Sequence, residues 1–527
     1  MTVPNGATPE RYGDTKKGAA TKPRLIRKLG CLELYQASLH ALDMYRGTSI
    51  ACTYCIPGRL ASSGQQEELE EALHSAVART VLQHPVLQVG IYREASRKPA
   101  YLQLDTVDLR QHVEWRTVES EDELEAMARE TLIAQIDTKF EDLEVRPAWR
   151  IAVLRRRDSR ALEVNFVWHH ALADGMSGKM FHETLLRHLT SVVGDGPMIP
   201  PDESRILDVS NSARRFPPPM EKMVKYPVSV GYTLSTLWQD VRPQMAGSAR
   251  HQVLAHWAPL RLTPPKTDIR RVRLSNERLR VVLAACRRHS TTLTGLLHGI
   301  VAVALSSLLS KGRAAGFLAK TAMNMRVATP ASASLIPKET MADIVSVVGH
   351  TYDLKTTAGI RSKIEAAATQ ASEKGRQVTL AEVVWSSATA ARADIKKALD
   401  KGVKDNIIGV MGFVPDWRDH GRSVAKKPRE SSWVITNLGV IERGVSDAQE
   451  GEGCDDGGKW HIEGASFSIN AQSTGAAISL CVIAVERGDL VLDVCWQRDV
   501  IDSMVAEGVA QVIEDWLTYF GTDRPTT

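Results

Sequence analysis

The sequence predicts a mixed α/β protein made of two similar halves, each a sheet flanked by helices. Three observations lead to this fold class. The chain has 527 residues, more than one ordinary hydrophobic core accommodates. Strand-like and helix-like patterns alternate in its first part and again in its last part. The stretch between them is rich in Pro, Ser and Arg, with PPP at 217–219, which is typical of a linker.

From these patterns we expect four segments along the chain. Residues 1–25 are polar and basic and lack an apolar core, so we expect a disordered start rather than a secretion signal. Residues 26–195 form the N-terminal subdomain, residues 196–265 a crossover linker, and residues 266–527 the C-terminal subdomain. Within this last segment, the acidic, glycine-rich stretch 444–459 is expected to be a surface loop.

Apolar periodicity predicts the elements of the first half. Helices are expected where apolar residues recur every three or four positions, and strands where they alternate with polar ones. The expected elements are a helix at 32–44, a strand at 48–56, helices at 67–84 and 120–136, strands at 149–155 and 161–170, and a helix from about 176 to 193.

The second half repeats this alternation. The expected elements are a strand at 268–274, a helix at 291–310, a strand at 317–326, two strands within 468–497 and a helix at 501–520. The stretch 291–310 carries no charge, but small and polar residues follow one face of it. A membrane span has no need of such a face, so we expect a buried core helix.

Charge and cysteine content narrow the possible functions. The net charge is +4 on 66 basic and 62 acidic residues, which is not the large positive excess typical of proteins that bind nucleic acid. Seven cysteines in a chain of this length indicate reduced thiols and a cytoplasmic setting. Cys52 and Cys55 form a lone CxxC in an expected strand, where they point to opposite faces. We therefore expect packing there, and no metal site.

The adjacent histidines His169 and His170 end the apolar strand ALEVNFVWHH. Alternation places His170 on the large apolar face and His169 on the other face, so the two rings cannot easily ligate one ion. Asp174 and Gly175 then supply a turn before the next helix. A histidine held between a strand end and a tight turn is well placed to line a cleft.

HHALADG, residues 169–175, resembles the HHxxxDG signature of the CoA-dependent acyltransferase superfamily. Residues 27–54 resemble the opening of its fungal alcohol acetyltransferase family, whereas the DFGWG motif of its plant branch is absent. Three further stretches are similar to superfamily segments: LQHPVLQVGI, CRRHSTTLTGLLHGIVAVAL and TNLGVIE. The resemblance implies two chloramphenicol-acetyltransferase-like subdomains with an active-site tunnel at their interface.

Acyl transfer from a thioester needs a base for the attacking group and donors for the oxyanion. His170 is the expected base, and neither a GxSxG elbow nor a nucleophilic cysteine motif is present. Asp174 either orients His170 or, as the resemblance implies, pairs with a distant arginine, for which Arg326 is the best match. His169 is expected to pack, and Gly175 to adopt a backbone angle closed to other residues.

Donors for the oxyanion are expected from the second half, as the resemblance implies. The candidates are Asn437, Ser473 and Thr474, each of which also suits an ordinary turn. Ser177 is expected to cap the following helix or to face the acceptor. The basic residues Lys311, Arg313 and Lys320 either reach the nucleotide of CoA or are simply solvated.

We therefore expect an acyl-CoA-dependent O-acyltransferase that uses acetyl-CoA as co-substrate, has no resident cofactor and forms an ester on a small-molecule alcohol. A fungal secondary-metabolite alcohol fits the resembled family. One alternative is amide formation or condensation with a carrier-bound acyl group, and another is a non-catalytic binding module. We expect a monomer without a transmembrane segment, in which the helix at 32–44 either packs on the first half or touches a membrane surface.

Overall fold

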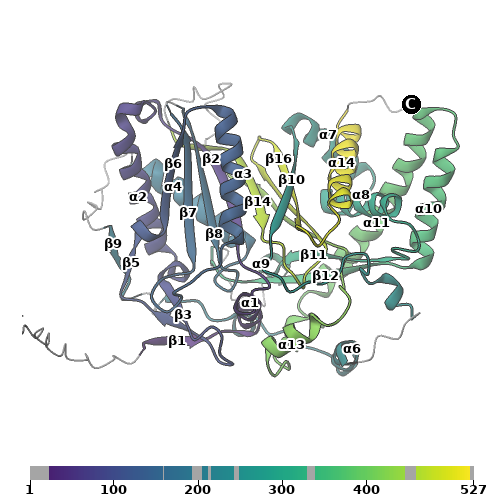
Figure 1. The fold of residues 1–527 in the computed structure, drawn as a ribbon, viewed down its shortest axis with the longest axis horizontal. Coiled ribbons are helices and arrows are strands. Elements are labelled where there is room, and N and C mark those ends of the chain that lie inside the picture. Colours follow the sequence, from purple (N-terminus) through teal and green to yellow (C-terminus); the bar gives the residue numbers. More distant parts are fainter. Residues whose placement is uncertain are drawn as a thin grey trace, which may run out of the picture.

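The computed structural model describes residues 23–157, 159–192, 205–211, 215–241, 248–328, 339–444 and 459–522. Two β-sheets lie side by side, with helices flanking each of them (Figure 1). The predicted α/β class with two sheet-centred halves is therefore present. The disorder predicted for residues 1–25 and the loop predicted for 444–459 lie almost entirely outside the described residues.

The first sheet has five strands in the order β14-β2-β8-β7-β6. Its central strand β8 pairs antiparallel with β2 on one side and β7 on the other. Helices α2 and α4 pack against each other, and α3 contacts strands of both sheets. The elements are β2 (Thr48–Cys55), β8 (Ala161–Trp168), β7 (Trp149–Arg156), β6 (Val113–Val118), α2 (Gln66–Gln83), α3 (Glu121–Asp137) and α4 (Gly175–Val192).

Strand β8 ends at Trp168, two residues earlier than the sequence predicts. Trp168 pairs with Thr48 and with Trp149, which are the first residues of β2 and β7. Beyond this pairing the N–H of His169 still reaches the carbonyl of Ala148 at 2.9 Å, but the regular ladder stops and His170 lies in the turn that follows. The indole of Trp168 helps to fix this turn, because its Nε1 donates a hydrogen bond to the carbonyl of Ala173 at 2.7 Å.

The second sheet has six strands in the order β10-β16-β15-β13-β11-β12. It is flanked by the long helices of the C-terminal half (Figure 1). The strands are β10 (Thr267–Leu274), β16 (Leu490–Gln497), β15 (Ile478–Val485), β13 (Trp433–Ile441), β11 (Phe317–Asn324) and β12 (Val345–Tyr352). The helices are α7 (Asn276–Arg288), α8 (Leu293–Leu308), α10 (Leu354–Ala368), α11 (Glu373–Lys401) and α14 (Ser503–Phe520).

Helix α8 is the buried core helix predicted at 291–310, and its small residues have a clear packing role. A Cβ built on Gly299 would lie 2.3 Å from the carbonyl oxygen of Val384, and one on Gly295 would lie 2.8 Å from that of Ala388. The small face therefore lets α11 approach the α8 backbone closely. Within the described residues no single helix is long and apolar enough to cross a membrane, although α7 and α8 pass that test together with an 88° bend between them.

One strand of the second half joins the first sheet. β14 (His461–Ile469) lies between β13 and β15 in sequence, yet it pairs antiparallel with β2 of the first sheet. A boundary at residue 266 therefore does not separate the two sheets. The domain limits expected from the sequence remain predictions. Cys52 and Cys55 lie on β2, and both are fully buried and form no disulfide.

The remaining elements connect and cover the two sheets. Strands β1, β4 and β3 form a small sheet in the order β1-β4-β3, and β5 pairs with β9. The predicted crossover segment carries β9, α5 and α6 within its described part. These elements are β1 (Leu25–Lys28), α1 (Cys31–Ala41), β3 (Val89–Tyr92), β4 (Ala100–Gln103), β5 (Thr106–Asp108), β9 (Ile206–Asp208), α5 (Met220–Met223), α6 (Val230–Val241), α9 (Met325–Ala328), α12 (Ile408–Met411) and α13 (Trp417–Val424).

Candidate active site

His170 lies in the turn between β8 and α4, with its imidazole only partly enclosed. The side chain is 16% exposed, whereas the Nδ1 atom is fully buried. The open part of the ring therefore lies on the side of Nε2 and the ring carbons. The ring of Tyr45 packs beside it, with the centroids 5.9 Å apart.

The partner of the buried Nδ1 is Asp343, a residue that the sequence analysis did not identify. Oδ2 of Asp343 lies 3.5 Å from Nδ1, and the carboxylate is fully buried. Neither of its oxygens has a hydrogen-bond partner in the described part of the chain. An acidic residue just ahead of a strand, as in MADIV, resembles an ordinary turn residue, so nothing local in the sequence marks it.

Burial and mutual attraction set the protonation of this pair. Burial disfavours the imidazolium of His170, but the neighbouring carboxylate of Asp343 outweighs that effect and raises the pKa of the ring above its ordinary value. Burial also raises the pKa of Asp343 to about 6, against the attraction of His170. The carboxylate of Asp343 therefore makes His170 a stronger base than a buried imidazole without a charged partner would be.

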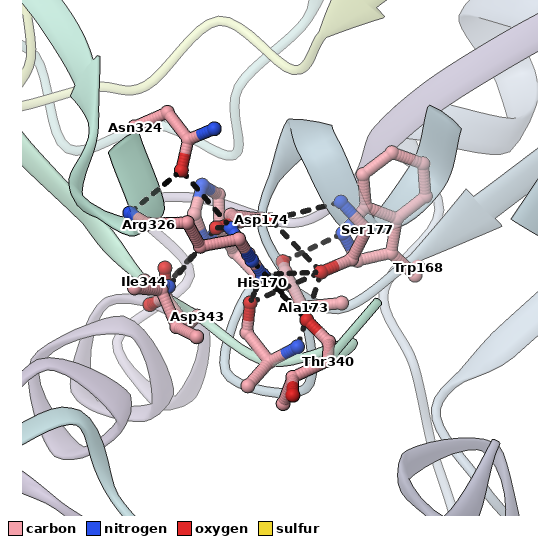
Figure 2. A network of polar contacts seen from close by, with 11 residues as sticks. Trp168, His170, Ala173, Asp174, Ser177, Asn324, Arg326, Thr340, Asp343 and Ile344 are labelled. Atoms are coloured by element: carbon pink, nitrogen blue, oxygen red, sulfur yellow. Dashed lines mark hydrogen bonds and ion pairs between the residues drawn. The ribbon is translucent and has the colours of Figure 1, made fainter. Parts of the chain in front are cut away.

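The carboxylate of Asp174 pairs with Arg326 rather than with His170 (Figure 2). Its Oδ2 accepts hydrogen bonds from Nη1 of Arg326 at 2.7 Å and from the backbone N–H of Ile344 at 3.0 Å. Its Oδ1 accepts from the backbone N–H and the hydroxyl of Ser177. Burial alone would raise the pKa of Asp174, but Arg326 holds that pKa below its usual value. Of the two arrangements left open by the sequence, the ion pair with Arg326 is the one present.

Ser177 neither caps the helix with its own side chain nor lies open to an acceptor. Asp174 provides the cap at the start of α4, because it accepts the N–H of Ser177. The fully buried hydroxyl of Ser177 shares its single proton between Oδ1 of Asp174 at 2.8 Å and the carbonyl of Ala342 at 3.0 Å, and it accepts the N–H of Ala342 at 3.1 Å. The start of α4 is thus bound to the segment that precedes β12.

His169 belongs to a buried cluster with His40 and Glu94. Nε2 of His169 lies 2.7 Å from Oε1 of Glu94, and Nδ1 of His40 lies 2.9 Å from the same oxygen. The other nitrogen of each ring accepts a backbone N–H, from Ala171 for His169 and from Phe140 for His40. Both rings therefore carry their proton toward Glu94, and burial lowers the pKa of His40 to about 4.

This cluster has the composition of a metal site but not the protonation of one. The three groups bring their ligand atoms within 4.8 Å of one another. A metal would need a lone pair on the two nitrogens that face Glu94, and those nitrogens carry protons here. The carboxylate instead accepts from both rings, which keeps the pKa of Glu94 at about 2 despite its burial. That no metal binds remains a prediction.

The expectation that Gly175 adopts an unusual backbone angle is wrong. The structure has positive φ at other glycines but not at Gly175, which begins α4. The glycine instead makes room for a neighbour, because a Cβ there would lie 2.7 Å from a methyl carbon of Leu438 on β13, which would have to shift. The glycine therefore allows a close approach of the two halves beside His170.

The three expected oxyanion donors lie in different surroundings. Asn437 on β13 uses its amide within the C-terminal half: it donates to Thr294 at 3.2 Å and accepts from the N–H of Gly439 at 2.9 Å. Ser473 lies beside the segment that carries Tyr45, since its N–H donates to the carbonyl of Met44 at 2.9 Å. Its buried hydroxyl has no hydrogen-bond partner in the part of the chain that the structure describes. Thr474 follows and is half-buried.

The basic residues near β11 are already engaged in ion pairs or exposed. Lys320 lies 2.6 Å from Glu430, and Arg313 lies 3.5 Å from Asp502. Lys311 is exposed. No interaction in the described residues directs these three side chains toward His170.

Comparison with known proteins shows which family this chain resembles along most of its length. The sequence profile of the alcohol acetyltransferase family matches residues 119–515. The chain is 26% identical over 512 residues to FCK4 of Fusarium pseudograminearum (strain CS3096), described as a probable alcohol acetyltransferase, with 95% of this chain and 96% of that protein covered. It is 21% identical over 506 residues to crmB of Aspergillus fumigatus, which is described in the same way, with 92% and 99% covered.

Solved structures with a similar fold include two acetyltransferases. The structure of TRI3, a trichothecene 15-O-acetyltransferase from Fusarium sporotrichioides, gives a TM-score of 0.65 at 13% identity over 94% of both chains. TRI101 of F. graminearum, complexed with coenzyme A and T-2 mycotoxin, gives 0.55 at 11% identity over 91% of this chain and 96% of that one. At these identities the likeness concerns the fold alone.

Proposed function

Since the chain belongs to the alcohol acetyltransferase family, we propose that it transfers an acetyl group from acetyl-CoA to the hydroxyl group of a small-molecule alcohol. The family, the acyltransferase class and the CoA-dependent acyltransferase fold predicted from the sequence are confirmed by these similarities. The alternative of a non-catalytic binding module is therefore set aside. What we propose beyond the family is the identity of the acyl donor, of the acceptor and of the catalytic residue.

The observation that carries the proposal is the half-enclosed imidazole of His170. Its Nδ1 is buried against Asp343, whereas the open side of the ring includes Nε2. A hydroxyl that meets Nε2 can give up its proton as its oxygen attacks the thioester carbonyl. When the tetrahedral intermediate collapses, the C–S bond breaks and the imidazolium returns the proton to the leaving thiolate. The products are an ester and free CoA.

Direct attack is favoured over an acyl-enzyme because four of the described thiols are poor nucleophiles. Burial raises the pKa of Cys31 to about 11 and that of Cys286 to about 12, and it places those of Cys52 and Cys481 well above their ordinary value. A thiol with such a pKa carries almost no thiolate at neutral pH. The enzyme should therefore follow sequential rather than ping-pong kinetics.

Ser473 is the candidate among the expected oxyanion donors that the geometry favours. It lies next to the segment of Tyr45, which packs on His170, and its hydroxyl is free of other hydrogen bonds in the described chain. The amide of Asn437 is already occupied by Thr294 and Gly439, so it is a weaker candidate. Thr474 stays a prediction.

Relatives support the choice of substrates. TRI101 was crystallised with coenzyme A and a mycotoxin, and the curated relatives with matching length are fungal. We infer acetyl-CoA as the donor and an alcohol of fungal secondary metabolism as the acceptor. Condensation domains share this fold to a similar degree, but the family profile and the curated relatives of matching length are those of alcohol acetyltransferases, which favours an alcohol acceptor over amide formation or a carrier-bound acyl group.

The test is an assay of the purified full-length chain with acetyl-CoA and panels of alcohols and amines. Release of free CoA should accompany ester formation, detected by mass spectrometry, and His170→Ala should lower kcat at least about 100-fold. His256→Ala, which truncates an exposed histidine, is the matched control and should retain full activity. Full turnover by folded His170→Ala would remove this residue as the base, and amide products or a requirement for a carrier protein would overturn the assigned substrates.

A further inference from the structure

Asp343 is a fully buried carboxylate to which the proposed reaction assigns no role. It lies on the segment between residue 339 and β12, and neither oxygen has a hydrogen-bond partner in the described chain. A buried carboxylate without partners is costly, so its retention calls for a reason. Its nearest charged partner is the Nδ1 atom of His170, 3.5 Å away.

The other ionisable groups that face this pair are each neutralised elsewhere. Glu33 on α1 is bound by Arg27 through two contacts of 2.7 Å. Asp174 is held by Arg326, as described above. The phenols of Tyr45 and Tyr101 are buried and hydrogen-bonded, to Thr48 and to the carbonyl of Ala171 respectively. Among the described residues, Asp343 is thus the carboxylate whose charge remains directed at His170.

The HHxxxDG turn fixes the backbone on both sides of Asp343. Before it, the carbonyl of Ala342 accepts from Nη2 of Arg326 at 3.0 Å and from the hydroxyl of Ser177 at 3.0 Å. After it, the N–H of Ile344 donates to Asp174 at 3.0 Å. These contacts form one network around Asp343 and His170 (Figure 2). The Asp174–Arg326 pair therefore positions Asp343, although it does not contact the imidazole itself.

We propose that Asp343 is a positioning residue that keeps the neutral imidazole of His170 protonated on Nδ1 and stabilises the imidazolium formed during acyl transfer. The proposal rests on the proposed role of His170 as the base. With the proton held on Nδ1, the lone pair of Nε2 is free for the acceptor hydroxyl. That hydroxyl proton moves to Nε2 and then to the CoA thiolate, while Asp343 remains ionised throughout.

The 3.5 Å separation fits a ligand-free site. At this distance the contact is an ion pair rather than a well-formed hydrogen bond. Catalytic contacts are often long in free enzymes and tighten when substrate binds. The raised pKa of His170, caused by Asp343 against the effect of burial, agrees with this arrangement.

The first test reads the protonation of His170 without any assay of activity. Nitrogen-15 NMR of the histidine-labelled full-length chain, with His170 assigned by its loss in His170→Ala, should show a proton on Nδ1 in the neutral ring. The titration midpoint of His170 should fall by about one pH unit or more in Asp343→Asn. Asp353→Asn is the matched control, because Asp353 caps α10 on the surface and Asn caps equally well. A midpoint unchanged in Asp343→Asn, or an Nε2–H tautomer in the wild type, would overturn the proposal.

The second test uses the acetyl transfer itself. Asp343→Asn should lower kcat at least about tenfold, leave the KM for acetyl-CoA within about twofold, and move the rising limb of the pH–rate profile to lower pH. A merely structural residue would lower kcat without moving that limb. Should the wild type prove inactive with every acceptor, the proposed function fails while the NMR result still decides on Asp343. Should Asp343→Asn fail to fold, a wild-type His170 midpoint at or below the ordinary value would reject the pairing.

Discussion

The carboxylate of Asp174 lies 2.7 Å from the guanidinium of Arg326, 152 residues further along the chain. Both side chains are almost completely buried, and the pair joins the turn after β8 in the first half to the end of β11 in the second. Arg326 also donates to the carbonyls of Thr340 and Ala342. Asp174 thus links the two halves through its ion pair with Arg326. The same pair holds the segment that carries Asp343 in place.

Replacing Arg326 should destabilise the protein strongly. Arg326→Ala leaves the buried carboxylate of Asp174 without its counter-ion, which costs about 3–5 kcal/mol. Denaturant unfolding followed by circular dichroism measures this loss. Arg59→Ala is the control, because Arg59 pairs with Glu68 on the surface and its loss should cost less than about 1 kcal/mol. Equal stability of Arg326→Ala and the wild type would contradict the role of the pair.

The cluster of His40, Glu94 and His169 predicts a difference between two substitutions of one residue. Glu94→Ala leaves the protons of two buried imidazoles unpaired, at about 1–3 kcal/mol each. Glu94→Gln should be milder, because an amide oxygen in the place of Oε1 can still accept from both rings, although the amide nitrogen then replaces the Oε2 that lies 3.0 Å from Nδ1 of His40. Thermal unfolding of the two variants provides the comparison. If zinc ions raise the melting temperature of the wild type but not of Glu94→Gln, the cluster is a metal site after all.

Two glycine-to-alanine substitutions in helices should act in opposite directions. A Cβ on Gly178 of α4 would lie 2.2 Å from the indole of Trp168, so Gly178→Ala should cost about 1–3 kcal/mol through overpacking beside the His170 turn. Gly359 lies on the exposed face of α10 with no atom within 4 Å of such a Cβ. Gly359→Ala should therefore stabilise the protein by up to about 1 kcal/mol. Unfolding free energies that change in the same direction for both would refute this packing.

Stability should decline as the pH falls from about 6.5 to about 4. Burial lowers the pKa of four histidines, His40, His84, His112 and His182, to about 4 in the folded state. Between 4 and 6.5 the unfolded chain binds protons that the folded chain excludes, so each buried ring costs up to about 1.4 kcal/mol per pH unit as the pH falls. Melting temperatures measured across this range should fall steadily.

A substitution of His182 measures the contribution of a single histidine to this pH dependence. Its Nε2 donates to the carbonyl of Ile50 at 3.0 Å and its Nδ1 accepts from the hydroxyl of Tyr54 at 2.9 Å, so the neutral ring is fully bonded. His182→Gln removes this titrating group, and the slope of stability against pH should become shallower whatever stability is lost overall. An identical slope in the variant would mean that His182 titrates alike in the folded and unfolded chains.

Local patterns in the sequence predicted much of the framework. Alternation along ALEVNFVW predicts β8, and apolar spacing in the stretch 291–310 predicts the buried helix α8. The two-residue error at His170 arose because a strand ends where its neighbours end, and Thr48 and Trp149 lie far from it in sequence. Neither α11 nor the transfer of β14 to the first sheet was foreseen, because each depends on contacts between distant segments.

The sequence by itself determined the position of His170, the turn that holds it and, through family resemblance, the arginine that pairs with Asp174. These features are written in short stretches of chain, where spacing and residue type set the local geometry. Only the tertiary structure decided that Asp343 is the carboxylate facing His170, and that Gly175 is needed for the approach of Leu438. The physical reason is that hydrogen bonds and packing act over a few ångströms in space, and folding alone determines which distant residues come that close.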